Sequence, residues 1–413
     1  MKGASTVSRR WIFSGLATAA WLLAACAPGA TPPAAGPSGA APKPAAPRSP
    51  ASAPPAAAAP SSGLPAASPD WDKVVEEARK EGEVIIWGES GSAGREFEKD
   101  AFEKAYPGIR VNLFQAPLSS DRDSRYLQEM QAGIARVDVM ISGSAGVNAR
   151  VKPAGGLQSL RPFLRDDVLA AGNWRDGKLL WVDKEQQYML MSDPVVYPPV
   201  TINDAVAQND LQRWEDLLDP KWQGKIVMMD PRGSGPGFAA GLMMYYNPNL
   251  GPAFAEKFFG NGIVFSADQR QNLEWTDSGR TLVNVFARPK EIEDLNGVGG
   301  TVHPRQSLTA SGKASASFNG SSGILFIPNL DPLPHPNAAK VYVNWFYSRA
   351  GQQAMVDVLQ VTSNRVDVDM SKLPPYIIPQ PGVEYMNMND ETYTATEKVQ
   401  AMRDDVNKWY RAP

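Results

Sequence analysis

Three short loops rich in glycine and serine are the parts of this sequence best suited to bind a ligand. They are residues 88–94, 142–146 and 232–237, and each follows a short apolar run typical of a β-strand. Free backbone N–H groups in such a loop bind anions, and a helix that starts there adds its positive N-terminus. The alternative is a turn whose glycines supply only a positive φ.

Side chains in and near these loops are the candidate ligand contacts. Arg232 is the leading cation, because a guanidinium recognises carboxylate, phosphate, phosphonate and sulfonate groups through paired hydrogen bonds. Each loop serine has an alternative role as a helix cap. Large aromatic residues are either pocket walls or core, namely Trp87, Trp181 and Tyr188. The predicted ligand-binding residues are Ser90, Gly91, Ser92, Ser142, Gly143, Ser144, Arg232, Gly233, Ser234, Gly235, Arg270, Trp275 and Arg288.

Residues for enzyme chemistry are sparse. Nucleophilic triads need a histidine, and the chain has only His303 and His335. The sequence shows no Gly-x-Ser-x-Gly elbow, no phosphate-binding Gly-Lys-Ser/Thr loop and no clustered metal ligands. We therefore predict a protein that is not an enzyme, with no catalytic residue, no cofactor and no metal. A hydrolase with a pair of carboxylates remains the alternative, since acidic residues are plentiful.

The elements that position these loops alternate between strand and helix. Ser68 and Pro69 begin a helix that Gly82 ends, and strands are expected at 83–87, 109–114 and 137–141. Such a strand–helix–strand order implies a parallel α/β sheet, and ligands of these sheets bind beyond the carboxyl ends of the strands. Residues 179–194 are expected to cross to a second lobe. Its strands are expected within 195–202, 226–229, 263–266 and 281–286.

The first 69 residues predict export and anchoring. Lys2, Arg9 and Arg10 precede an apolar run that is too short to span a bilayer, so residues 1–26 are expected to be a signal peptide. The run ends at Cys26, the only cysteine, which has the surroundings of a bacterial lipidation site. The twin arginines also fit export by the twin-arginine route. Residues 27–69 are almost wholly Ala, Pro, Ser and Gly, which predicts a disordered spacer.

Charge excludes some classes of partner. Residues 1–69 carry five of the 41 basic residues and none of the 44 acidic ones. The remaining 36 basic residues give residues 70–413 a net charge of −8. No basic stripe for nucleic acid is present, and binding of anionic lipid through charge is not expected. A single cysteine allows no disulfide within the chain, so packing must stabilise the fold.

Three longer motifs resemble one family. They are Trp214–Ile226 (WEDLLDPKWQGKI), Asp230-Pro231 and Pro334–Gln353 (PHPNAAKVYVNWFYSRAGQQ). Together they are similar to the extracellular solute-binding proteins of ABC importers, in the branch that includes the ferric-ion-binding proteins. Residues 76–82 and 362–366 fit the same resemblance, which covers about residues 71–370.

The resemblance implies two α/β lobes that close on one small solute by a hinge and deliver it to a membrane permease. We expect lobe 1 at about 70–185 and 290–335 and lobe 2 at about 190–288. The lobe joined by 336–413 is left open. The implied protein is a monomer held outside the cytoplasmic membrane by lipid on Cys26.

The resemblance allows one ligand, ferric iron, to be tested against the sequence. Iron binders of this family use adjacent tyrosines after a strand, whereas the corresponding stretch here, 278–290, has no tyrosine and contains Arg288 and Lys290. Tyr245-Tyr246 is expected to serve packing. An organic, phosphorus or sulfur oxyanion is the predicted ligand, with ferric iron on the same fold as the alternative.

Overall fold

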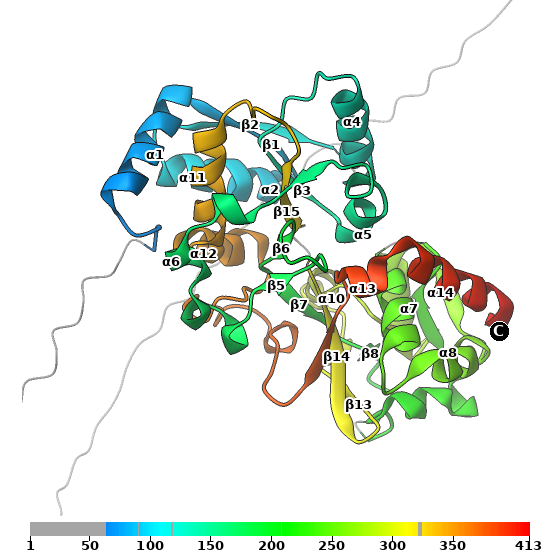
Figure 1. Ribbon diagram of the computed structural model, residues 1–413. Coiled ribbons are helices and arrows are strands. Elements are labelled where there is room, and N and C mark those ends of the chain that lie inside the picture. Colours follow the sequence, from blue (N-terminus) through cyan, green and yellow to red (C-terminus); the bar gives the residue numbers. More distant parts are fainter. Residues whose placement is uncertain (1–62, 90, 117–118, 208, 234, 321–323) are drawn as a thin grey trace, which may run out of the picture. The chain divides into compact units, whose positions relative to one another are not determined.

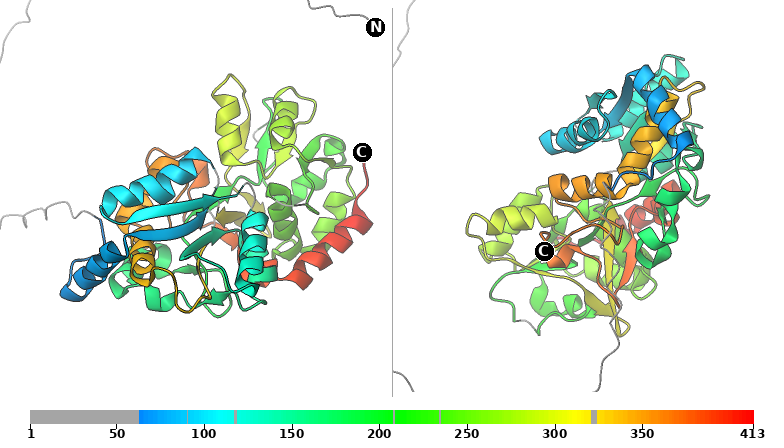
Figure 2. Two further views of the ribbon diagram at one scale, coloured as in Figure 1. Left: turned by 90° about the horizontal axis from the view of Figure 1, so that it is seen from above. Right: turned by 90° about the vertical axis from the view of Figure 1, so that its left-hand side faces the viewer.

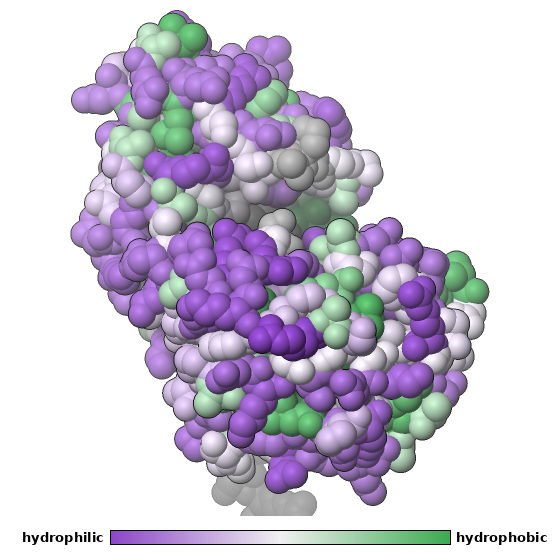
Figure 3. All heavy atoms as spheres, turned by 90° about the vertical axis from the view of Figure 1, so that its right-hand side faces the viewer, coloured by the Kyte–Doolittle hydropathy of each residue, from purple (hydrophilic) through white to green (hydrophobic). Residues whose placement is uncertain are grey.

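The computed structural model describes residues 63–413 except 90, 117–118, 208, 234 and 321–323. The predicted signal peptide, Cys26, most of the spacer, Ser90 and Ser234 lie outside the described residues. Within the described part, no helix is long and apolar enough to cross a membrane. The face drawn in Figure 3 is mostly hydrophilic, and its hydrophobic residues lie in small separate groups.

The first sheet has seven strands in the order β2-β1-β3-β15-β6-β5, with β4 beside β15. β1 is parallel to β2 and β3, as the strand–helix–strand pattern predicted, whereas β15 is antiparallel to β3. The strands are β1 (Glu83–Gly88), β2 (Arg110–Gln115), β3 (Val139–Ser142), β4 (Leu157–Gln158), β5 (Leu180–Trp181), β6 (Leu190–Met191) and β15 (Ile324–Pro328).

Helices cover both faces of this sheet (Figures 1 and 2). Val84 and Ile86 of β1 join one hydrophobic cluster, and Trp87 joins the other. Successive side chains of a strand point to opposite faces, so a strand buried on both faces is apolar throughout. The helical segments are α1 (Pro69–Glu81), α2 (Ser92–Arg95), η1 (Glu96–Ala101), α3 (Phe102–Ala105), α4 (Ser119–Gln131), α5 (Ser144–Gly146), η2 (Val147–Val151), α11 (Pro336–Tyr347) and α12 (Arg349–Leu359).

Helix α1 shows how the sequence fixes an element. The Ser68 side chain accepts a hydrogen bond from the Trp71 N–H, Pro69 occupies the first turn, and Gly82 ends the helix at φ 78°. Its buried face packs against α11, and α12 packs against η1. Residues 336–359 therefore belong with the first sheet, which the sequence had left open.

The second sheet has five strands in the order β10-β9-β11-β8-β12. Helix α10 packs on α9, and β12 pairs with β8, so residues 290–305 lie with this sheet and not with the first lobe as expected. The elements are β8 (Val200–Ile202), β9 (Ile226–Met229), α7 (Pro236–Tyr246), α8 (Gly251–Phe259), β10 (Val264–Ser266), α9 (Gln269–Asp277), β11 (Val283–Val285), α10 (Pro289–Asn296) and β12 (His303–Arg305).

A third sheet of four strands joins the other two. β14 lies between β13 and β16, and β7 pairs antiparallel with β14. The chain passes from the first sheet to the second through β7, and it returns through β13 and β14. The crossing thus lies at 192–199, after the expected 179–194, because β5 and β6 still belong to the first sheet. The strands are β7 (Pro194–Tyr197), β13 (Leu308–Ala310), β14 (Lys313–Gly320) and β16 (Glu384–Asn387).

The C-terminal helices contact both halves of the molecule. α13 (Glu391–Thr394) contacts α5 and η2 beside the first sheet, whereas α14 (Thr396–Trp409) contacts α7 and α8 beside the second (Figure 1). Shorter helical segments complete the fold, namely η3 (Arg161–Phe163), α6 (Asp166–Leu169), η4 (Ala171–Asn173), η5 (Arg175–Gly177), η6 (Trp214–Leu218), η7 (Pro220–Trp222) and η8 (Pro375–Ile377).

Candidate functional site

A cavity of about 430 Å³ receives two of the three predicted loops. Gly143 and Ser144 line it from the end of β3, and Gly233 and Gly235 line it from the end of β9. The carboxyl ends of these strands are where ligands of open α/β sheets bind. The predicted positions therefore meet in one place, although they come from different sheets.

The loop after β3 is fixed by hydrogen bonds. The Ser142 hydroxyl donates to Asp123 Oδ1 at 2.7 Å, and the Ser144 hydroxyl donates to Asn389 Oδ1 at 3.0 Å. Both serines are buried. Ser142 does not line the cavity, because its side chain serves Asp123 instead. Ser144 and Gly143 present this loop to the cavity.

The loop after β9 owes its path to two glycines. Gly235 has a φ of 80°, which favours glycine. A Cβ on Gly237 would lie 2.1 Å from the Met229 carbonyl oxygen, so only glycine lets the start of α7 sit on the end of β9. Phe238 and Ala239, in the first turn of α7, also line the cavity. This loop therefore aims the N-terminus of α7 at the cavity.

The remaining wall comes largely from the C-terminal segment, which the sequence analysis did not connect with the site. Asn319 and Gly320, at the end of β14, also line the cavity. The C-terminal lining residues are Met388, Asn389, Thr394, Thr396, Val399, Gln400 and Arg403. Those on α14 fall at positions three, four and seven after Thr396, so they share one face of the helix.

Arg403 is the only cationic side chain among the described residues that line the cavity. Its Nη2 donates to the Gly233 carbonyl oxygen at 2.9 Å, and its Cζ lies 5.5 Å from the centre of the Phe238 ring. Its buried Nε has no hydrogen-bond partner among the described residues, and no described carboxylate lies within ion-pair distance. The guanidinium of Arg403 thus lines the cavity without an ion-pair partner among the described residues.

The predicted cations are engaged elsewhere. Arg232 donates to both oxygens of Asp230, at 2.8 and 2.5 Å, and to Asn407 at 3.0 Å. Its guanidinium also lies about equally far from the rings of Phe265 and Tyr410. Burial favours a raised pKa for Asp230, but the hydrogen bonds and charge of Arg232 outweigh it and hold that pKa below its usual value. Arg232 therefore closes its own loop and does not line the cavity.

Arg270, Trp275 and Arg288 also lie outside the cavity lining. Arg270 forms an exposed ion pair with Glu274 at 2.8 Å, and Trp275 lies 3.9 Å beneath the guanidinium of Arg280. Arg288 pairs with Glu291 at 3.2 Å. A Cβ on Gly235 would lie 3.2 Å from Arg288 Nη2, which places Arg288 beside the cavity wall.

The loop after β1 lies over acidic side chains. Gly91 and Ser92 are exposed and do not line the cavity. Beneath them, Glu98 Oε1 accepts a hydrogen bond from the Glu89 N–H at 2.9 Å, and the Glu89 carboxylate pairs with buried Arg122. Burial raises the pKa of Glu98 to about 8. This loop therefore does not contribute to the described cavity lining.

Aromatic and histidine candidates have structural partners. Trp87 is buried against Phe114, and His335 Nδ1 lies 2.8 Å from Asp138. The Tyr245 hydroxyl donates to Asp405 at 2.7 Å, and the Tyr246 hydroxyl donates to the Lys398 carbonyl, so this pair serves packing as expected. In the part of the chain that the structure describes, no group of three or more His, Cys, Asp or Glu could hold a metal ion.

Comparison with known proteins places the chain in a family. The model of the bacterial extracellular solute-binding proteins matches residues 99–374, and the chain belongs to that family. One curated relative, an uncharacterised protein of Haemophilus influenzae, is 22% identical over 202 residues. These residues make up 48% of this chain, which spans about half (53%) of that relative's length.

Solved structures share the fold at low identity. A putative extracellular solute-binding protein from Bordetella parapertussis is 14% identical with a TM-score of 0.60, covering 80% of this chain and 99% of its own. Iron-bound HitA from Pseudomonas aeruginosa is 15% identical with a TM-score of 0.56, covering 78% and 99%. AfuA from Actinobacillus pleuropneumoniae, with fructose-6-phosphate bound, is 16% identical with a TM-score of 0.56, covering 79% and 97%.

The predicted family and the predicted two-lobed α/β fold are thus confirmed. Membership implies that the folded part works outside the cytoplasm. The family match ends at residue 374, so Met388, Asn389 and Arg403 lie beyond it.

Proposed function

We propose that this protein captures a small organic oxyanion in the cavity and delivers it to the permease of an ABC importer. The position of Arg403 is the observation that best supports a negatively charged ligand. Its guanidinium faces the cavity without a described acidic partner, and its Nε has no described hydrogen-bond partner. An oxyanion that accepted hydrogen bonds from the accessible part of this guanidinium would form charge-assisted bonds, which are about twice as strong as neutral ones.

Helix N-termini add to this preference for negative charge. The first turn of α7 contributes Phe238 and Ala239 to the lining, and the first turn of α14 contributes Thr396. Each helix N-terminus carries unpaired N–H donors and roughly +0.5 of an elementary charge. The hydroxyl of Thr396 adds a donor that suits the oxygens of a carboxylate, phosphate or sulfonate.

The size and lining of the cavity favour a small organic molecule. About 430 Å³ lies near the lower end of the usual range for ligand pockets. Phe238, Met388 and Val399 give it apolar walls, which suit a carbon skeleton beside the charged group. A single cation matches a single negative charge better than a highly charged ligand.

Neither alternative finds support in the described lining. A carboxylate-pair hydrolase needs two acidic side chains facing the substrate, and a ferric site of the family's kind needs tyrosines. The described residues that line the cavity include no Asp, Glu, His or Tyr.

A thermal-shift panel tests the proposal on the purified protein. Succinate, glucose 6-phosphate, taurine and inorganic phosphate would be compared with glucose, glycerol and ferric citrate. A ligand at 100 times its Kd adds about 2.7 kcal/mol to the free energy of unfolding, so a binding anion should raise Tm by several degrees. A panel in which only neutral sugars or metal ions raise Tm would contradict the oxyanion.

Anchoring outside the membrane belongs to the same proposal. Lipid on Cys26 would hold the protein at the membrane as a monomer, and residues 27–69 would act as the spacer. Radiolabelled palmitate should label the native protein in a bacterial host and should not label Cys26→Ala. Equal labelling of both would remove Cys26 as the anchor.

A further inference from the structure

The segment that carries Arg403 contacts both halves of the molecule within a few residues. The chain crosses between the first and second sheets at β7 and at β13–β14, and a third connection follows near the C-terminus. We call residues 388–396 the third crossing. They line the cavity at Met388, Asn389, Thr394 and Thr396.

The first-sheet end of the third crossing is held by buried and half-buried polar contacts. The Glu391 N–H donates to the Val182 carbonyl at 2.8 Å, and Lys152 Nζ lies 2.6 Å from the Glu391 carboxylate. Asn148 Nδ2 donates to the Thr394 hydroxyl at 2.9 Å. Lys152 and Glu391 are each less than one-fifth exposed, so their ion pair is partly shielded from water.

The second-sheet end is held mainly by apolar packing. Met402 and Val406 of α14 are fully buried. Tyr410, which follows α14, stacks on Phe265 with ring centres 4.2 Å apart and an interplanar angle of 9°. Fully burying side chains of this size contributes about 1.5–3 kcal/mol each, so α14 is firmly fixed to the second half.

Ala395 alone separates the helices α13 and α14, and the first fully buried residue of α14 is Met402. Ala395 has a non-helical conformation, with φ −57° and ψ 141°. Tyr393 of α13 also contacts the Tyr246 ring of α7, with ring centres 6.1 Å apart. Movement of one half relative to the other must therefore bend the chain near Ala395 or break one of these contacts. Arg403 lies two turns along α14 from this point, so the same movement shifts Arg403 relative to Ser144.

We propose that the third crossing restrains the two halves and couples the position of Arg403 to their separation. Ligand binding and closure would then depend on the short hinge at Ala395 as well as on the two crossings through the third sheet. This inference goes beyond the charge of the solute, because it concerns the molecule without any ligand.

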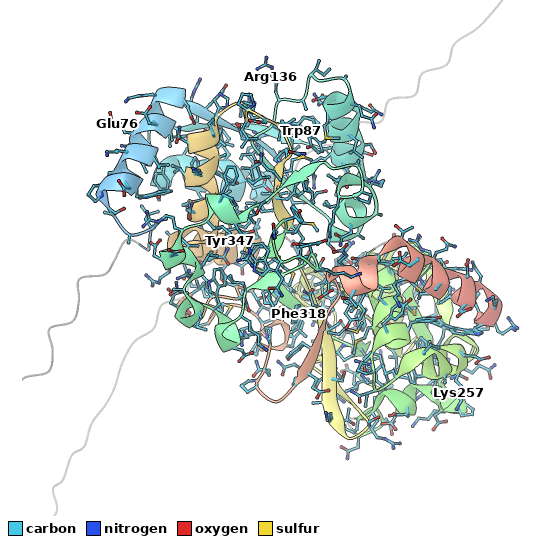
Figure 4. The ribbon with its side chains drawn as sticks, in the orientation of Figure 1. Glu76, Trp87, Arg136, Lys257, Phe318 and Tyr347 are labelled. Atoms are coloured by element: carbon cyan, nitrogen blue, oxygen red, sulfur yellow. The ribbon has the colours of Figure 1, made fainter. Side chains whose placement is uncertain are left out.

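Distances between labels on the two halves test the restraint. Cysteines would replace Glu76 on α1 and Lys257 on α8, which are both exposed and lie far apart in Figure 4. The Cys26→Ser background leaves no other thiol for the spin labels. A specific protease site between Thr394 and Ala395 would then be cut, while the packing of α14 retains the released fragment.

The matched control carries the same protease site between Val298 and Gly299, an exposed turn beside the second sheet. Without added solute, we expect the cut at 394–395 to widen the distance distribution roughly twofold, because lobe motion is limited by its connections. The control cut should leave the distribution unchanged. Equal distributions before and after the cut at 394–395 would overturn the inference.

A second variant is needed in case the fragment released by the protease dissociates. A flexible Gly-Ser insertion between Thr394 and Ala395 loosens the third crossing without cutting the chain, and it should also widen the distribution. A native distribution in that variant would overturn the inference. The thermal-shift panel can show no anion binding while the distance distribution still widens. The panel can also show anion binding while the distribution does not change. The two proposals are therefore tested separately.

Discussion

The region matched by the family model and the C-terminal segment line the same cavity with different chemistry. The matched region contributes mainly small residues and backbone, as at Gly143, Gly233 and Gly235. The C-terminal segment contributes functional side chains, among them Asn389 and Arg403. Under the proposed function, the shared fold would build the place for a ligand, and the segment beyond residue 374 would supply the side chains that select it.

Replacing Arg403 tests this comparison with the largest expected effect. Arg403→Met keeps much of the side-chain volume and removes the charge and the donors. Loss of a desolvated cation should weaken binding of the best anion from the panel by about 3–4 kcal/mol, or several hundredfold in Kd. Calorimetric titration measures the change. Arg270→Met, which removes an exposed cation away from the cavity, should leave Kd unchanged.

A second prediction concerns the first-sheet half of the molecule, where buried Glu98 should make the free energy of unfolding depend on pH. Its pKa is raised from an ordinary value of 4.5 to about 8, chiefly by burial. Below about pH 4.5 the proton is bound in both the folded and the unfolded chain, so the contribution of Glu98 to the free energy of unfolding is at its maximum. As pH rises toward 8, only the folded chain keeps the proton, so stability falls on the order of 3 kcal/mol.

Urea unfolding at pH 5 and pH 8 measures this loss. Glu98→Gln keeps an acceptor for the Glu89 N–H but does not titrate, so it should remove most of the difference between the two pH values. Glu96→Gln, at an exposed neighbouring position, should retain it. A native pH dependence in Glu98→Gln would show that Glu98 is not the titrating group.

Gly237 tests whether the matched region acts through backbone geometry. Gly237→Ala would place a Cβ 2.1 Å from the Met229 carbonyl oxygen and push α7 away from β9. Such overpacking should lower the free energy of unfolding by about 2 kcal/mol. Thermal unfolding measures it against Gly172→Ala, where a Cβ meets nothing within 4 Å and φ is not positive. Equal Tm values for the two variants would refute this account of the loop.

Replacing Asn389, in the C-terminal segment, should change the Kd for the anion by less than replacing Arg403. Asn389→Asp preserves the acceptor for the Ser144 hydroxyl and places a negative charge at the cavity wall. Repulsion of a bound anion should raise Kd about tenfold, and less at high salt. Titration in low and high salt checks the sign and the screening. Tighter binding of the anion by Asn389→Asp would argue for a cationic ligand.

Much of the fold followed from the sequence because local signals agreed. Apolar strands that alternate with helices, glycine-rich loops and the Ser68 cap predicted β1, β2, β3 and α1 within a residue or two. Residues 290–305, within the range 290–335 expected in lobe 1, were assigned to the wrong half, since the pairing of β12 with β8 depends on contacts about 100 residues apart. Such pairing leaves no local mark in a short strand.

The cation that lines the cavity, Arg403, was not among the predicted residues, although a local signal exists. Arg232, Arg270 and Arg288 each have a carboxylate two to four residues away, with which they pair. Arg403 has Val399, Gln400, Val406 and Asn407 at the helical spacings of three and four. Asp405 is two residues away, but residues two apart on a helix do not face each other, so this pattern indicates an arginine without an ion pair along its helix. That α14 returns to the cavity is a long-range fact that this spacing does not contain.

A crystal structure of the protein with the anion that raises Tm most tests the central claim directly. We predict that electron density for the anion lies in the cavity, with an oxygen within hydrogen-bond distance of the Arg403 guanidinium and the carbon skeleton against Phe238 and Val399. Density for the anion at Arg232, Arg270 or Arg288, with none beside Arg403, would contradict the account.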